Sequence, residues 1–283
     1  MPSGRLVRTQ SMIFTLMGDY LRYREGEFAV GNIIKMMRTL GYTDQAVRSA
    51  LSRMCGNNWL HNRRAGNKSY YRLTGKSEAL LERGYHRIFF THQRSCEWNG
   101  QWQILTYSIP EDKRNLRVKL RKELAWLGYG ALSYGCWITP YNLSEEVHKI
   151  VDSLGISKNV QVFQASFLGY ATEKELVTKC WNLRKINDAY DIFYKKYYRR
   201  FQTLKRKLAG AGYLEPAGCF VERVLLIHEY RKFPFLDPGL PLGLLPDDWI
   251  GIKVAGFVRE YREWLEKPAN ELISSVVNTT TSS

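Results

Sequence analysis

Residues 44–56, DQAVRSALSRMCG, have the spacing of a helix whose two faces differ in chemistry. Apolar side chains recur at i, i+3, i+4 and i+7, which predicts one buried stripe: Val47, Ala50, Leu51 and Met54. The opposite face is polar and has no carboxylate beyond Asp44 at the helix start: Gln45, Arg48, Ser49, Ser52 and Arg53. Arginine can contact guanine edges or phosphates, glutamine can contact adenine, and serine permits close approach. This face is therefore predicted to enter the major groove of DNA, although a solvated helix face would have the same pattern.

A second basic group follows in residues 59–74, WLHNRRAGNKSYYRLT, which predict two strands around a turn of small and polar residues. We expect Arg63, Arg64 and Lys68 at this turn. Positive side chains on an exposed hairpin are typical of a surface that lies against phosphates.

The elements around these residues decide between DNA contact and a plain solvated surface. Helices are predicted from Ser11, over residues 30–41 and after Thr43, with Gly41 ending the second and Thr43 capping the third. A fourth helix is predicted after Thr74. Two helices, a tight turn, a third helix and a basic hairpin form the order of a winged helix-turn-helix. We therefore predict a DNA-binding domain of this kind in residues 1–95.

The charge of the chain supports an acidic partner for this domain. The formal net charge is +15 over 283 residues. Residues 1–95 hold 16 Lys and Arg against 6 Asp and Glu, whereas residues 96–175 hold 9 against 9 and residues 176–283 hold 17 against 12. The excess is concentrated beside the predicted groove-binding helix, as in a dedicated polyanion-binding module.

The cysteines are five in number, scattered, and never spaced as CxxC. This pattern predicts neither a disulfide framework nor a zinc site, and we expect no metal and no cofactor. The amino-terminal residues have no secretory pattern, and the uncharged stretch 124–144 is interrupted by glycines and a proline. We expect a cytoplasmic protein that does not bind membranes.

The middle segment, residues 96–175, alternates strand and helix patterns. Strands are predicted over 102–110, 131–140 and 159–169, and helices over 113–128 and 144–155, with room for one more strand. This order favours a ferredoxin-like domain, and dimerisation is a natural use for it.

Two catalytic interpretations of the middle segment are possible, and neither is favoured. Ser133 in ALSYG resembles a nucleophile elbow, but a strand and a proline follow it where that motif needs a helix. Glu111 and Asp112 are adjacent acids, but acids at the start of a helix usually complement its dipole.

The carboxy-terminal segment, residues 176–283, is predicted to be mainly helical. Residues 187–210 place an aromatic stripe on one face, expected to be core or subunit interface, and a basic face that includes Arg199 and Arg200. That basic face could be solvated, contact DNA phosphates or bind a phosphorylated ligand. A helix ending in His228, Tyr230 and Arg231 then runs into a loop stiffened by four prolines, which could form a pocket wall or a rigid connector.

Six stretches, in this order and spacing, resemble the phenylacetate-degradation repressors, the PaaX family: GDYLRYREGEF, AVRSALSRM, NWLHNRRAGNKSYYRLT, WQILTYSIPEDKRNLR, GYGALSYGCWITP and HEYRKFPFLDPGLPLGLLPDDW. The resemblance implies a bacterial repressor that binds a palindromic operator as a homodimer and is released by phenylacetyl-coenzyme A. It also implies a winged-helix, a ferredoxin-like and a helical domain. The acidic residue of related CRISPR-adaptation nucleases corresponds here to Ser108, which argues against a metal-dependent nuclease.

The resemblance assigns the DNA role to the helix face and the hairpin: Gln45, Arg48, Ser49, Ser52, Arg53, Arg63, Arg64 and Lys68. It makes the HEYR stretch a family signature, for an effector pocket or a domain contact. Candidate effector residues are basic or lie in that stretch: Arg199, Arg200, His228, Tyr230 and Arg231. A coenzyme A ester needs cations at its phosphates and an apolar slot for its acyl end. The competing hypotheses are a thioester hydrolase using Ser133 and His228, a nuclease, or an RNA-binding protein.

Overall fold

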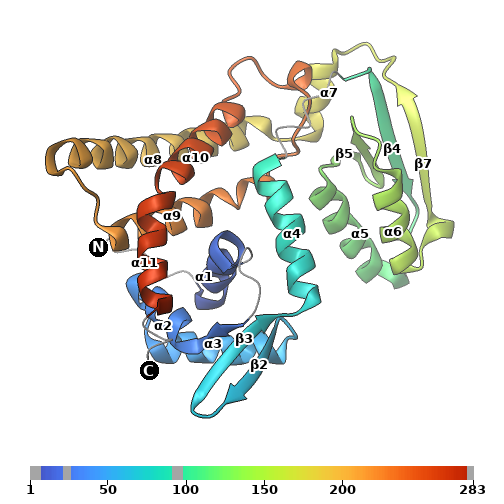
Figure 1. Ribbon diagram of the computed structural model, residues 1–283. Helices are drawn as coiled ribbons and strands as arrows, with labels where there is room; N and C mark the ends of the chain where they lie inside the picture. The colour runs from blue at the N-terminus through green and yellow to red at the C-terminus, as the bar shows by residue number, and fades with distance from the viewer. Residues whose placement is uncertain (1–7, 22–26, 91–97, 279–283) are drawn as a thin grey trace. The chain divides into compact units, whose positions relative to one another are not determined.

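The computed structural model (Figure 1) describes residues 8–21, 27–90 and 98–278. It is a mixed α+β structure with two small antiparallel sheets and a helical carboxy-terminal region, as the sequence predicts. Packing divides the chain into two compact units. Unit 1 comprises residues 1–89, 194–231 and 255–283, and unit 2 comprises residues 90–193 and 232–254. The carboxy-terminal segment thus contributes to both units.

Unit 1 begins with α1 (Thr9–Leu16), which continues into a π-helical turn, η1 (Met17–Leu21). The expected start at Ser11 is wrong, because the helix begins two residues earlier. The helices α2 (Val30–Thr39) and α3 (Asp44–Gly56) follow, joined by a turn in which Gly41 has φ +88°.

The start and the buried stripe of α3 are as predicted. The Thr43 hydroxyl accepts a hydrogen bond from the Ala46 N–H at 3.3 Å. All four residues of the predicted stripe are 0% exposed: Val47, Ala50, Leu51 and Met54. Burial of four side chains fixes the rotation of α3 about its axis, and therefore fixes which face meets the solvent.

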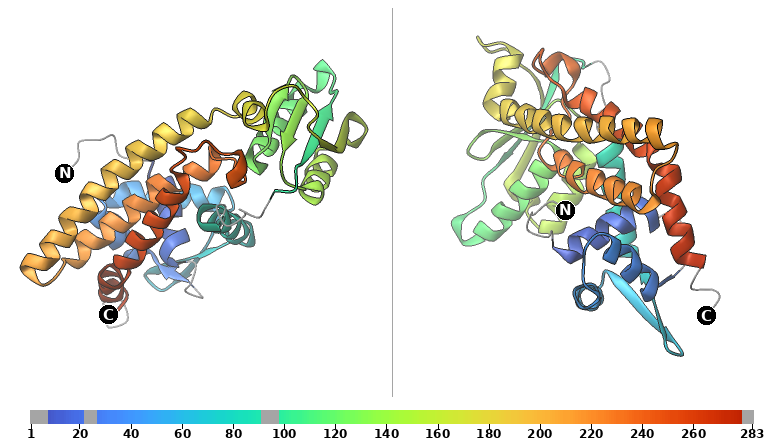
Figure 2. Two further views of the ribbon diagram at one scale, coloured as in Figure 1. Left: turned by 90° about the horizontal axis from the view of Figure 1, so that it is seen from above. Right: turned by 90° about the vertical axis from the view of Figure 1, so that its left-hand side faces the viewer.

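A three-stranded sheet completes the amino-terminal part of unit 1. It consists of β1 (Phe28–Ala29), β2 (Leu60–Ala65) and β3 (Lys68–Leu73), in the order β1-β3-β2. Figure 2 (right) shows the β2–β3 hairpin extending beyond the α2–α3 pair. Helix α4 (Gly75–Phe90) follows, and Thr74 caps it as predicted, since its hydroxyl accepts from the Ser77 N–H at 3.2 Å.

The remaining helices of unit 1 come from the carboxy-terminal segment. They are the second part of α8 (Leu183–Ala211), α9 (Pro216–Tyr230), most of α10 (Gly251–Trp264) and α11 (Glu266–Asn278). Helix α9 packs against α1, and α11 packs against both α9 and α2. The aromatic stripe of α8 is core: Phe201 is 2% exposed and its ring lies 4.4 Å from that of Tyr261.

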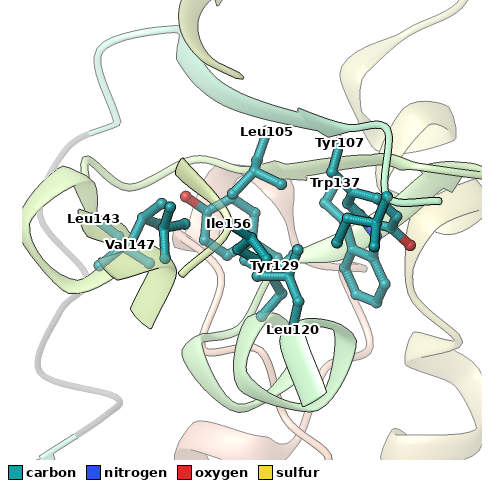
Figure 3. Packing of buried hydrophobic residues seen from close by; sticks show 11 residues of the cluster. Leu105, Tyr107, Leu120, Tyr129, Trp137, Leu143, Val147 and Ile156 are labelled. Carbon is teal, nitrogen blue, oxygen red and sulfur yellow. The ribbon is translucent and has the colours of Figure 1, made fainter. Parts of the chain in front are cut away.

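Unit 2 contains a four-stranded antiparallel sheet and the two helices on one of its faces. Its order along the chain is β4 (Gln101–Tyr107), α5 (Arg114–Leu127), β5 (Gly130–Ser133), β6 (Cys136–Thr139), α6 (Ser144–Leu154) and β7 (Val160–Ser166). The strand order across the sheet is β5-β6-β4-β7. Figure 3 shows the core between this sheet and its helices, where Leu105, Leu120 and Trp137 pack together.

The single strand expected over residues 131–140 is wrong, because the chain reverses there and forms the β5–β6 hairpin. Gly135 occupies the turn with φ +78°, and a Cβ at this position would lie 2.9 Å from the Tyr107 carbonyl oxygen. A left-handed residue this close to backbone has room only for glycine. The turn supplies the additional strand for which the sequence left room.

The rest of unit 2 is α7 (Glu173–Cys180), the first part of α8 and the proline-rich loop. The loop is fixed by buried contacts, since the Tyr190 hydroxyl donates to Asp237 at 2.8 Å and the Tyr190 ring stacks on Phe233 at 4.2 Å. Among the described helices, none combines the length and the apolar character needed to cross a bilayer.

Candidate nucleic-acid interface

The outer face of α3 brings together the five residues that the sequence predicts to contact DNA. All of them are exposed: Gln45, Arg48, Ser49, Ser52 and Arg53. They lie opposite the buried stripe, so the packing that holds α3 in place also presents this face to solvent.

Asp44, at the start of α3, lies within electrostatic range of Arg48 but forms its ion pair elsewhere. Asp44 is held by the Arg38 guanidinium of α2, with Nη2 2.7 Å from Oδ2, and this contact keeps the pKa of Asp44 below its usual value. In the part of the chain that the structure describes, no carboxylate forms an ion pair with Arg48 or Arg53. The guanidinium groups of α3 therefore remain available to an external anion.

The hairpin differs from the prediction in where its arginines lie. Arg63 and Arg64 are inside strand β2, paired with Tyr70 and Ser69, and the turn itself is formed by residues 66–67. Lys68 is the first residue of β3 and is partly buried. Consecutive residues of a strand point to opposite faces, so Arg63 and Arg64 lie on opposite sides of the hairpin.

Arg64 lies on the side of the hairpin that faces α3. Its face includes Leu60, Tyr71 and Leu73, which are buried where the hairpin meets α3. Burial raises the pKa of Tyr71, and the positive charges of Arg48 and Arg64 both oppose this rise. The two guanidinium groups therefore lie within electrostatic range of one phenol, and the structure brings Arg64 together with the α3 face.

Arg63 is engaged on the other side of the hairpin. Its guanidinium bonds to the Glu27 carboxylate, with Nε–Oε2 at 2.7 Å, and lies 5.0 Å from the centre of the Tyr70 ring. The contact lowers the pKa of Glu27. A paired arginine offers less net positive charge to a phosphate than an unpaired one, so the two arginines of β2 are not equivalent.

The predicted effector residues on α8 have different surroundings. Arg199 is exposed, whereas Arg200 bonds to Glu222 of α9, with Nη2–Oε2 at 2.6 Å. The Glu222 side chain is 8% exposed and also accepts from the Tyr261 hydroxyl at 3.0 Å. Arg200 therefore serves as counter-charge to a buried acid.

The HEYR residues lie at the end of α9 and contact α1. His228 is 2% exposed, and its Nδ1 lies 2.7 Å from the Thr15 hydroxyl. Arg231 donates to the Ser11 hydroxyl at 2.6 Å, and Tyr230 is 2% exposed. These contacts tie the end of α9 to α1 within unit 1.

A buried charge cluster, which the sequence analysis did not predict, joins η1 to α9 and α10. The Asp19 carboxylate of η1 accepts from Arg223 Nε of α9 and from Arg262 Nε of α10, both at 2.8 Å. Only 1% of the Asp19 side chain is exposed, against 3% for Arg223 and 16% for Arg262. The one available signal was that Asp19 is the single charged residue within residues 11–21.

Comparison with known proteins gives the family of this chain. Three family models match it: "PaaX-like protein" over residues 8–77, "PaaX protein central Cas2-like domain" over 95–177 and "PaaX-like protein C-terminal domain" over 181–275. The transcriptional repressor PaaX of Escherichia coli (strain K12) is 33% identical over 244 residues, covering 85% of this chain and 75% of the relative. The chain belongs to the PaaX-like family. The resemblance stated from the sequence is thereby confirmed.

A solved structure shares the fold. The uncharacterized protein Rv0674 from Mycobacterium tuberculosis has a TM-score of 0.61 at 21% identity, covering 94% of this chain and 99% of the other. Within the PaaX-like chain, Asp19 lies in the first matched segment and Arg223 and Arg262 in the last. The buried charge cluster thus joins the two outer family segments inside unit 1.

Proposed function

We propose that this protein is a ligand-responsive transcriptional repressor that binds palindromic operator DNA as a homodimer and controls phenylacetate breakdown in the cytoplasm. Phenylacetyl-coenzyme A is the proposed effector that releases it. The E. coli relative, a transcriptional repressor, supports this function. The observation that carries it is the exposed, acid-free face of α3 with Arg48 and Arg64 around Tyr71.

The proposed domains follow the three family segments. Residues 1–95 form a winged helix-turn-helix, in which α3 enters the major groove and the β2–β3 hairpin contacts the flanking backbone. Residues 96–175 form a ferredoxin-like domain, supported by the β-α-β-β-α-β order and the strand order β5-β6-β4-β7, and serve dimerisation. Residues 176–283 form a helical domain that takes part in effector binding.

Each surface residue has a proposed role. Arg48 and Gln45 contact base edges, and Ser49 and Ser52 allow the helix to approach the groove closely. Arg53 and Arg64 contact phosphates and set the position of the helix on the duplex. Arg63 and Lys68 add weaker phosphate contacts. Such contacts release counterions, so binding should weaken steeply with salt.

Effector release requires coupling between the ligand and the DNA-binding surface. The coupling free energy of such systems is about 1–3 kcal/mol. Exposed Arg199 is available to a coenzyme A phosphate, and the contacts of His228 and Arg231 with α1 supply a direct link from α9 to the amino-terminal helices. No observation favours the hydrolase alternative, because His228 is 2% exposed and engaged with Thr15.

The experiment uses Arg48→Ala. An operator is first selected from random duplexes with the wild-type protein, and the affinities for that operator and for random DNA are then measured at fixed salt. We expect Arg48→Ala to lose about tenfold or more of the operator-to-random ratio, because one good base contact gives about 1–3 kcal/mol of discrimination. Arg83→Ala, which removes an exposed arginine of α4, is the matched control. An unchanged ratio for Arg48→Ala would refute the proposed recognition helix.

A further inference from the structure

A hollow of about 450 Å³ lies in unit 2 on the face of the sheet opposite α5 and α6. Sites for small organic ligands have volumes in this range. Strand alternation explains its position, because Leu105 and Tyr107 point into the core and Trp102 and Ile104 to the other face. The walls are mostly apolar: Trp102, Ile104, Leu132, Ile138, Phe167 and Leu176.

The rim of the hollow carries two charged side chains of opposite sign, and their own contacts differ. Helix α7 contributes Glu175 and Lys179 to the lining. The Glu175 carboxylate is occupied by its own helix cap, since it accepts from the Thr172 N–H at 2.7 Å. Lys179 is exposed and forms no ion pair with any residue that the structure describes. The hollow therefore suits a ligand that combines an apolar group with an anionic or oxygen-rich end.

A buried donor without an acceptor lies in the same wall. Trp102 is 3% exposed, and its Nε1–H has no hydrogen-bond partner among residues 8–21, 27–90 and 98–278. Buried N–H groups are nearly always paired, because leaving one unpaired costs about 1–3 kcal/mol. Because Trp102 also lines the hollow, this donor is the candidate partner for a carbonyl oxygen of a ligand bound there.

The loop after β7 shapes one wall of the hollow. The Phe167 ring lies directly against Gly169, where a Cβ would meet the end of the ring. Leu168 and Tyr170, by contrast, are almost fully exposed. The loop thus contributes one aromatic ring to the wall of the hollow.

We propose that this hollow binds an aromatic acyl group. The ring packs against Ile104, Leu132 and Phe167, the carbonyl oxygen accepts from Trp102 Nε1, and Lys179 lies at the polar end. The identity of the acyl group rests on the proposed function, which makes it phenylacetyl. A free arylacetate and its coenzyme A thioester carry the same group, and the experiment separates them.

The experiment is a calorimetric titration of the full-length protein in its native oligomeric state. The titrants are phenylacetyl-coenzyme A, phenylacetate, acetyl-coenzyme A and coenzyme A. The wild type should bind phenylacetyl-coenzyme A at least about tenfold more tightly than acetyl-coenzyme A, because acetyl-coenzyme A lacks the ring that would fill the apolar hollow. Heat from the thioester but not from phenylacetate would identify the thioester as the source, and the reverse result would identify the free acid.

Substitutions at three positions locate the site. Leu132→Trp fills the hollow and should reduce the affinity for the phenylacetyl ligand by about tenfold or more. Trp102→Phe removes the donor and should reduce it by about tenfold. Lys179→Met should weaken binding, and Lys179→Arg should restore it. Val118→Trp and Lys158→Met introduce the same side chains at exposed positions of unit 2 outside the hollow, and they should bind the ligand as the wild type does.

The outcomes separate this proposal from the repressor function. Suppose that the phenylacetyl ligand binds Leu132→Trp, Trp102→Phe and Lys179→Met as it binds the wild type, and releases each of them from the operator. The hollow is then refuted as the acyl site, and the repressor function stands. If neither phenylacetyl ligand binds the wild type, the acyl site is also refuted, and operator binding alone decides the repressor function. Because Lys179 is exposed, its variants should fold even if Leu132→Trp does not, so the proposal remains testable.

Discussion

The buried cluster around Asp19 permits a quantitative test of how unit 1 is held together. The perturbation is Asp19→Asn, which removes one negative charge and keeps the size of the side chain and one carbonyl-type acceptor. Two guanidinium groups, Arg223 and Arg262, would then remain buried without their common counter-charge.

The magnitude follows from the geometry of the cluster. Each Nε–Oδ contact is 2.8 Å long, and opposite charges about 4 Å apart attract by about 4 kcal/mol at an effective dielectric constant of about 20. Desolvation costs several kcal/mol per ion, so the intact cluster contributes little net stability. Removing the shared acid is different, because the desolvation cost remains and the attraction is lost. We expect the free energy of unfolding to fall by about 3–5 kcal/mol.

The assay is chemical unfolding followed by circular dichroism. Asp247→Asn breaks the exposed ion pair with Lys174 and serves as control, with no resolvable change expected. Adding Arg262→Met to Asp19→Asn should recover part of the loss, since it removes one of the two guanidinium groups that lost the Asp19 counter-charge. If Asp19→Asn lowers the free energy of unfolding by less than about 1 kcal/mol, the reasoning is refuted, because a loss that small is typical of a solvent-exposed ion pair.

Three further predictions concern the hairpin, a buried acid and a turn. Arg64→Ala should lower the salt slope of DNA binding by about one, and Arg63→Ala should lower it less because Glu27 already pairs with Arg63; equal slopes in a salt titration would contradict this. Burial is the main cause of the raised pKa of Glu222, so the folded protein binds this proton more tightly than the unfolded chain does. The stability contributed by Glu222 should therefore decline as the pH rises from the usual carboxyl pKa through the raised one. Unfolding curves measured from pH 4 to 8 should show this decline for the wild type and not for Glu222→Gln. Gly135→Ala should cost about 1–3 kcal/mol in urea unfolding, given its φ of +78°, and an unchanged midpoint would show that the turn relaxes.

Local sequence patterns predicted α3 well because its determinants are local. The 3.6-residue period placed Val47 and Leu51 in the core, and Thr43 and Gly41 marked the cap and the turn. The polar face then followed from the same period, since it is what remains once the buried stripe is assigned.

The errors arose where a turn competes with a strand pattern. Arg63 and Arg64 were expected at the turn because they are polar, but backbone conformation decides, and Gly66 has φ +57°. The same effect divides residues 131–140 at Gly135. A single glycine in an otherwise strand-like run is a weak signal, and only the pairing of β6 with β4 makes the reversal visible.

Other features depend on residues far apart in the chain. Asp19 lies 204 and 243 positions from its two arginines, so no local period relates them. The hollow in unit 2 likewise combines strands with α7. Side-chain type indicated that Asp19 is unusual, but its partners follow from tertiary packing alone.

The packing of α9 and α11 against α1 and α2 has a consequence for modularity. Many regulators carry a DNA-binding head that folds alone and can be transplanted onto another protein. A fragment ending near residue 90 would lose α9 and α11, which pack over α1 and α2. Asp19 would then lack its two arginine partners, and Thr15 would lack its contact with His228. Helix α3, the proposed recognition helix, is therefore part of a structure built from both ends of the chain. If the proposal holds, exchanging specificity between relatives requires grafting individual α3 side chains instead of exchanging the amino-terminal segment.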